Sequence, residues 1–143
     1  KEFISKINTN LDPLHSLYLS TAPVGFAIQA QDQIIKKIAE KGSSVIVGRA
    51  ADYVLRDNKK VIRIFIHAPK EYRVKNIMEM YGDNEKDAIK NVEKSDKARK
   101  NYYKTISSLE WGEASNYDLS IDASIGKELT ADIICEYIKK VNK

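Results

Sequence analysis

The chain has 143 residues, of which 43% are apolar and 31% charged, a composition that fits one globular domain and excludes a disordered chain. The formal net charge of +4 fits a polyanionic ligand as well as a nucleic acid or plain surface lysines. No apolar run is long enough to span a membrane, and no signal peptide is visible. The single cysteine, Cys135, cannot form an internal disulfide and indicates a reducing, cytoplasmic setting.

The first part of the chain is predicted to be helical. Apolar side chains recur at helical spacing in residues 1–10, and Asp12 followed by Pro13 is typical of a helix start. Residues 21–25 have the composition of a loop. A longer helix is expected over residues 26–41, because isoleucines recur along one face and lysines cover the other.

Residues 43–49 form the strongest strand prediction. Val45, Ile46 and Val47 follow one another without a polar interruption, which is typical of a strand buried on both faces of a parallel sheet. Arg49 then stands at the carboxyl end of this strand, where open α/β sheets bind ligands. Its guanidinium suits phosphate oxygens, although a pairing with a nearby carboxylate is an equal alternative from position alone.

The remaining elements alternate between helix and strand. First come a helical turn at 50–55, a strand at 61–67 and a helix that begins at residue 69 and stops at Gly82. A mostly polar helix follows from 85 to about 108, capped by Asn84. The chain ends with a strand at 117–121 and an amphipathic helix that is capped by Thr130 and in which Cys135 is expected to be buried. This alternation predicts a mostly parallel sheet. Three strands leave its edges poorly covered, so we interpret the sequence as the later part of a larger doubly wound α/β domain.

Several short stretches carry a family resemblance. They are VIVGR at 45–49, ADYVL at 51–55, IFIHA at 64–68 with Arg73 in the next helix, SDKARKNYY at 95–103, and Trp111 with YDL at 117–119. In this order they resemble the bacterial cytidylate-kinase-like proteins, which are P-loop nucleoside-monophosphate kinases or their close relatives. The resemblance covers residues 29–143. No single stretch is decisive, but the ordered set is fairly specific.

The resemblance implies a fold and an activity. The fold is a P-loop NTPase-like parallel sheet flanked by helices, with a mobile helical lid. The activity is phosphorylation of a pyrimidine nucleoside monophosphate such as CMP, with ATP and Mg²⁺ as cofactors. The implied layout is one kinase-like domain over residues 1–143, with candidate acceptor-binding helices at 1–28, a core at 29–82 and 109–143, and a lid at 83–108.

The resemblance also implies roles for individual side chains. Fixed cationic groups stabilise the negative charge of phosphoryl transfer, and the implied catalytic residues are Arg49 on the acceptor phosphate with Lys97 and Arg99 on the closing lid. Arg73 would approach the donor nucleotide. The other implied substrate-binding residues are Asp52, Asp96, which could also orient a lid cation, and Tyr102 and Tyr103, which could cover a base or pack the lid.

Each of these residues has a simpler interpretation. Arg73 alone would be taken as a solvent-facing helix residue, and the run around Lys97 as a solvated face. Asp52 can pair locally with Arg56, four residues on. Only one ring of the adjacent tyrosines 102 and 103 can be well buried. The two histidines, His15 and His67, are interpreted as incidental and structural, and with one cysteine they argue against a zinc site.

Two departures from the family pattern leave alternatives open. No G-x-x-x-x-G-K-[ST] loop is present, so we interpret the first strand and P-loop as missing from this chain. Ala50 stands where better-characterised cytidylate kinases carry an aspartate, which leaves the catalytic carboxylate undetermined. The first alternative function is a non-catalytic nucleotide-binding or regulatory module, and a weaker one is a small RNA-binding protein. No membrane partner is expected, and the oligomeric state stays open, a homodimer included.

Overall fold

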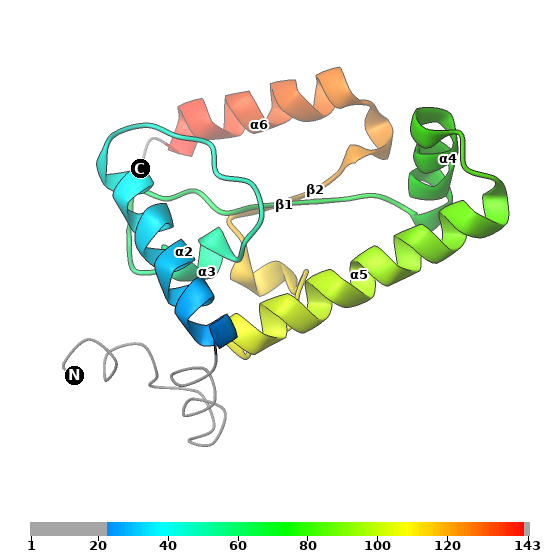
Figure 1. Ribbon diagram of the computed structural model, residues 1–143. Coiled ribbons are helices and arrows are strands. Elements are labelled where there is room, and N and C mark those ends of the chain that lie inside the picture. Colours follow the sequence, from blue (N-terminus) through cyan, green and yellow to red (C-terminus); the bar gives the residue numbers. More distant parts are fainter. Residues whose placement is uncertain (1–22, 142–143) are drawn as a thin grey trace. The chain divides into compact units, whose positions relative to one another are not determined.

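The computed structural model describes residues 23–141 (Figure 1). The expected helix in residues 1–10, the cap at Asp12 and the histidine at position 15 lie outside these residues. The chain divides into two compact units. The first comprises residues up to Asp57 together with Ile106–Ser108, and the second comprises Asn58–Thr105 and Leu109–Lys143.

The first unit is built on helix α2, Pro23–Glu40, and the short helix α3, Ala51–Val54. The helix α2 begins at Pro23, inside the predicted loop, because proline fits the first position of a helix, where no amide donor is needed. The apolar side chains of Val54 and Leu55 are buried, as the sequence predicted. After α3 the guanidinium of Arg56 lies 4.1 Å from the ring centre of Tyr53.

The predicted strand at residues 43–49 is wrong for this structure. The segment is an irregular loop and pairs with no strand among the described residues. Val45 and Val47 are 93% and 87% exposed, and Ile46 between them is only partly buried, so the segment is not a buried strand. A run of β-branched residues reports a preference for an extended backbone, whereas burial needs a neighbouring strand and covering helices.

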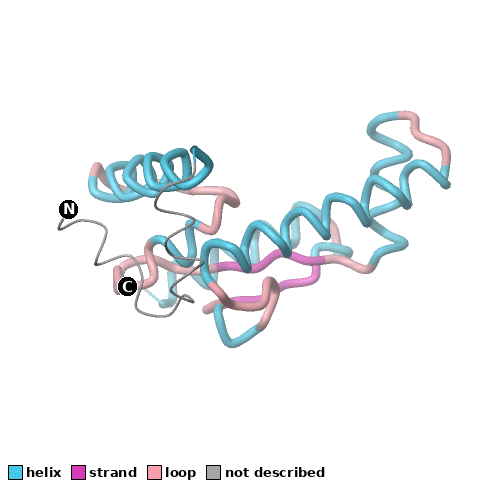
Figure 2. Tube along the Cα trace, turned by 60° about the horizontal axis from the view of Figure 1, so that its bottom comes forward, coloured by secondary structure: helices cyan, strands magenta, loops and turns pink. Residues whose placement is uncertain are grey.

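The second unit contains a parallel pair of strands, β1 at Ile64–His67 and β2 at Leu119–Asp122 (Figure 2). Both fall inside or beside the predicted ranges, in register from Ile64 opposite Leu119 to His67 opposite Asp122. The two strands therefore end at the same edge, and the prediction of a parallel sheet is confirmed for them. The expected third strand is the unpaired segment of the first unit.

Two helices that follow β1 pack on each other. They are α4, Lys70–Tyr81, which ends at Gly82 in a left-handed conformation, and α5, Glu85–Ser107, whose last two residues belong to the first unit. Asn84 caps α5 as predicted, since its Oδ1 accepts from the amide of Asp87 at 3.0 Å. The contact between the helices is the cluster of Val74, Ala88 and Val92. This packing fixes the side chains of α4 against those of α5.

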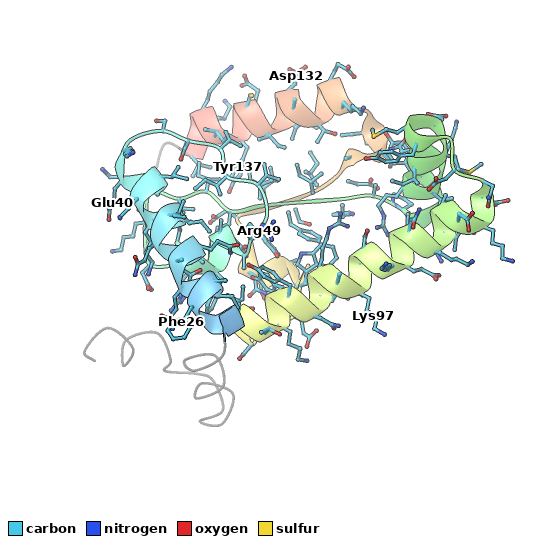
Figure 3. All side chains as sticks on the ribbon, viewed as in Figure 1. Phe26, Glu40, Arg49, Lys97, Asp132 and Tyr137 are labelled. Atoms are coloured by element: carbon cyan, nitrogen blue, oxygen red, sulfur yellow. The ribbon has the colours of Figure 1, made fainter. Side chains whose placement is uncertain are left out.

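The chain ends with helix α6, Lys127–Val141, after the short turns Ala114–Asn116 and Ala123–Ile125. Thr130 is not its N-cap. The helix begins three residues earlier, and the hydroxyl of Thr130 instead donates to the carbonyl of Gly126 at 2.6 Å. The predicted burial of Cys135 is also wrong, because its side chain lies on the exposed side of α6. Tyr137 reaches from α6 to donate to the carbonyl of Asp118 at 2.9 Å (Figure 3). Within the part of the chain described, no helix is long and apolar enough to cross a membrane.

Candidate functional site

Arg49 lies in the loop between α2 and α3 (Figure 3). Its backbone conformation is unusual. Gly48, Arg49 and Ala50 have φ angles of 74°, 59° and 52°, so three consecutive residues are left-handed. Only glycine adopts this region without cost, and residues held there cluster at functional sites. The side chain of Arg49 is exposed. Its backbone carbonyl accepts a hydrogen bond from Nε2 of Gln31 at 3.5 Å. The loop therefore presents a guanidinium from a strained and defined backbone.

A carboxylate that sequence reasoning missed lies in the same unit. The Oδ1 atom of Asp32 is buried without a hydrogen-bond partner among the described residues. Burial raises the pKa of this carboxyl, while the charges of Lys36 and Arg56 act in the opposite direction. A lone aspartate on a lysine-rich helix carries no sequence signal of burial, because only the packing around it removes the solvent. Asp52, the acid nearest to Arg49 in sequence, is half-buried in the first turn of α3.

The second unit brings three of the predicted site residues together on helices α4 and α5. One nitrogen of Arg73, Nη1, lies 2.8 Å from both carboxylate oxygens of Asp96. Nη1 of Arg99 approaches the same carboxylate from one turn along α5, at 3.4 Å from Oδ1. We call these residues the Arg73–Asp96–Arg99 cluster. Two guanidinium groups thus converge on one anionic group.

Arg73 is held from a second side. Its Nε donates to the carbonyl of Ala68 at 3.1 Å, at the junction where β1 leads into α4. The side chains of Arg73 and Asp96 are 33% and 23% exposed, whereas that of Arg99 is 59% exposed. The alternative that Arg73 is a freely solvated helix residue is therefore wrong.

Beside the cluster, one face of α5 lines a shallow hollow of about 370 Å³. Its lining residues are Glu93, Asp96, Lys97, Lys100 and Asn101. Lys97 projects outward from α5 (Figure 3). Glu93 is paired with Lys70 of α4 at 2.6 Å. The hollow thus combines two lysines with two acids, Glu93 and Asp96, that already have cationic partners.

The remaining predicted residues take separate places. Tyr103 is buried and Tyr102 half-buried, which agrees with the expectation that only one ring of the pair could be well buried. Arg49 and Asp52 belong to the first unit, whereas the Arg73–Asp96–Arg99 cluster and Lys97 belong to the second.

The carboxyl ends of the paired strands carry His67 and Asp122. His67 stacks against Phe65, with ring centres 6.0 Å apart, in line with a structural role. The amide and hydroxyl of Ser124 lower the pKa of the Asp122 carboxyl, with a smaller effect from His67. Across the described residues, no three side chains of histidine, cysteine, aspartate or glutamate are placed to share a metal ion.

The chain is similar to known proteins over most of its length. The sequence model of the cytidylate kinase-like family matches residues 14–125. The cytidylate kinase of Methanocaldococcus jannaschii is 32% identical over 90 residues, which are 62% of this chain and 51% of that enzyme. The chain thus spans about half the length of this relative. A crystal structure of an uncharacterized protein from Eubacterium ventriosum superposes with a TM-score of 0.79 and 32% identity, covering 98% of this chain and 82% of the other.

Proposed function

This chain belongs to the cytidylate kinase-like family, and from that premise we propose that it is part of an enzyme that transfers the γ-phosphoryl group of ATP to a pyrimidine nucleoside monophosphate in the cytoplasm. In this reaction an oxygen of the acceptor's phosphate forms the new bond to phosphorus, and ADP leaves. The observation that supports the proposal most directly is the Arg73–Asp96–Arg99 cluster, in which two guanidinium groups from different helices point at one anion.

The proposed roles follow from the charge of the reaction. Phosphoryl transfer requires two polyanions to be held in line while negative charge spreads over the transferred group. We assign Arg99 and Lys97 of α5 to that charge, Arg73 to the donor's phosphates, and Arg49 to the acceptor's phosphate. Its strained loop gives Arg49 a defined starting position. These assignments give each phosphate a fixed cationic partner.

The uncharged and acidic residues would complete the nucleotide site. Tyr102, half-buried on α5, is proposed to cover a base, while the buried Tyr103 packs the lid, residues 83–108, in place. Asp52 is proposed to contact the acceptor, since it lies three residues after Arg49 in the same unit. Asp96 would contact substrate only after releasing its arginines.

The family implies Mg²⁺, and the described residues show no preformed site for it built from protein side chains alone. They contain no three-membered group of potential ligands, and Asp96 already has two cationic partners. Mg²⁺ in such reactions is usually held by one or two carboxylates together with the phosphates of the substrate. The roles proposed for the arginines and lysines do not depend on the ion.

The loop that cradles ATP phosphates is proposed to come from a part of the protein other than these 143 residues, which contain no such motif. The unpaired segment at 43–47 supports this idea, because its exposed Val45 and Val47 would be buried in a larger sheet with helices on its faces. The absent motif is also the observation that favours the second candidate, a nucleotide-binding or regulatory module without catalysis.

A coupled assay of ADP release with the full-length protein would separate these functions. We expect turnover with CMP or another pyrimidine monophosphate and little with AMP or GMP. Arg99→Gln should lower kcat about 100-fold, which corresponds to the loss of one charge-stabilising donor. Lys94→Gln removes a positive charge from an exposed position on the same helix and should leave kcat unchanged. Nucleotide binding by calorimetry without ADP release would instead support the non-catalytic module.

A further inference from the structure

We propose that Asp96 is an internal substitute for a phosphate group, which holds Arg73 and Arg99 in the absence of nucleotide and must release them when a polyphosphate binds. The inference rests on the proposed function, because it concerns the regulation of the same cationic site. It differs from a direct contact between Asp96 and substrate, since the carboxylate acts here as a competitor of the ligand.

Arg73 uses different nitrogens for its two hydrogen-bonding partners. Nε is held by the carbonyl of Ala68 at 3.1 Å, and this contact lies on the arginine's own strand-to-helix junction. Nη1 faces the carboxylate of Asp96 at 2.8 Å. The backbone contact can therefore keep the guanidinium in place while its anionic partner is exchanged.

A carboxylate and a phosphate satisfy a guanidinium in the same way, through oxygens that carry negative charge. Asp96 supplies one negative charge to two guanidinium groups, so the Arg73–Asp96–Arg99 cluster keeps a net positive charge. Lys97 and Lys100 line the adjoining hollow and add to it. A polyphosphate carries several negative charges and can satisfy more of these cations than a single carboxylate.

The exposure of the side chains suggests the order of exchange. Arg99 is 59% exposed and makes the longer contact, at 3.4 Å, so it would leave Asp96 first. Arg73 is 33% exposed and would follow. The hollow of about 370 Å³ beside Asp96 lies within the range of small-ligand sites, roughly 300–1,000 Å³. An incoming phosphate thus has room next to the carboxylate that it displaces.

Displacement has a thermodynamic consequence. Part of the favourable binding energy of the polyphosphate is used to break the pairs with Asp96, so the resting contact lowers the apparent affinity. A neutral side chain of the same size at position 96 should remove this penalty. The effect should be modest, because ion pairs that are partly open to solvent are individually weak.

The test is the affinity of the full 143-residue chain for inorganic tripolyphosphate, measured by calorimetry at fixed ionic strength. We expect Asp96→Asn to bind about fivefold more tightly than the original chain, by loss of a weak competing pair. Glu93→Gln is the matched control, because it removes one negative charge from the same hollow without releasing either arginine. The gain from Asp96→Asn must exceed that from this control.

A second background tests the mechanism. In Arg73→Gln the carboxylate keeps only its longer contact with Arg99, so adding Asp96→Asn should tighten tripolyphosphate binding less than it does in the original chain. Unchanged or weaker tripolyphosphate binding by Asp96→Asn would overturn the inference. Trp111 packs edge-on against Phe65 in the same unit, so its fluorescence reports whether each variant is folded. If Asp96→Asn does not fold, Asp96→Ser is judged by the same criterion.

The outcome is distinguishable from failure of the proposed function. Tighter tripolyphosphate binding without ADP formation by the full-length protein would retain the substitution of Asp96 for phosphate and reject the kinase. ADP formation without tighter tripolyphosphate binding would retain the kinase and reject the substitution of Asp96 for phosphate.

Discussion

One carboxylate oxygen of Asp118, Oδ2, accepts hydrogen bonds from both the backbone amide and the Nε of Arg63, at 2.8 and 3.3 Å. The carbonyl of Arg63 in turn accepts from the amide of Asp118 at 2.8 Å. The two residues stand immediately before β1 and β2, where they fix the register in which the strands begin to pair.

We expect Asp118→Ala to lower the free energy of unfolding by about 2 kcal/mol, because it removes charge-assisted hydrogen bonds to a half-buried guanidinium and leaves that group unsatisfied. Urea denaturation followed by Trp111 fluorescence would measure the loss. Glu136→Ala breaks an exposed pair with Lys139 at 2.7 Å and should change stability by less than about 0.5 kcal/mol. Equal effects of the two substitutions would contradict a special role for the Asp118 contact.

Gly112 lies directly against the ring of Phe65. A Cβ atom at this position would stand 2.9 Å from Cζ of the ring, and the φ angle of 83° is one that other residues rarely adopt. Gly112→Ala should therefore cost about 1 kcal/mol for the backbone and a further 1–2 kcal/mol for displacing the ring. Gly82→Ala, at φ 72° with no atom within 4 Å of the added Cβ, carries the backbone cost alone. Thermal denaturation of both variants measures the difference, and equal midpoints would show that the ring moves freely.

Local sequence signals predicted local structure well. The cap at Asn84, the stop at Gly82 and the parallel strands were predicted because each depends on residues close in sequence or on a simple alternation of elements. The strand at 43–49 was wrong because burial depends on neighbours that a pattern of valines does not specify. The cap at Thr130 was wrong because a threonine hydroxyl can bind the carbonyl four residues back within a helix as readily as it caps one.

In the candidate site, too, the sequence pointed to individual residues but not to the contacts between them. The family resemblance pointed to Arg73, Asp96 and Arg99 as separate functional residues, and the structure shows them as mutual partners. Arg73 and Asp96 lie 23 positions apart on different helices, so no helical spacing rule connects them. Asp32 gave no signal at all, since its burial is a product of packing.

The buried carboxylate of Asp32 predicts a pH-dependent stability. Since burial raises its pKa above 3.8, the folded state binds this proton more tightly than the unfolded state does. The bound proton stabilises the folded state fully at a pH below the unfolded-state pKa. This stabilisation is lost as the pH rises through the folded-state pKa. Asp32→Asn should therefore gain stability over the original chain as the pH rises from about 3 to 7, by roughly 0.5 kcal/mol after solvent screening. Urea midpoints across this range measure it, and a stability difference between the two chains that does not change with pH would contradict it.

The left-handed backbone of Arg49 predicts that stability and activity respond in opposite directions. Arg49→Gly removes the cost of holding a side-chain-bearing residue at φ 59°, so the free energy of unfolding should rise or stay level, by about 0 to 1 kcal/mol. The same change removes the guanidinium proposed for the acceptor phosphate and should lower kcat/KM of the full-length protein about 100-fold. Ser108 has the same φ angle in the same unit and no proposed role, so Ser108→Gly should match the stability change without the loss of activity. A fully active Arg49→Gly would remove Arg49 from the site, and a marked loss of stability would show that its left-handed conformation is not a strain relieved by glycine.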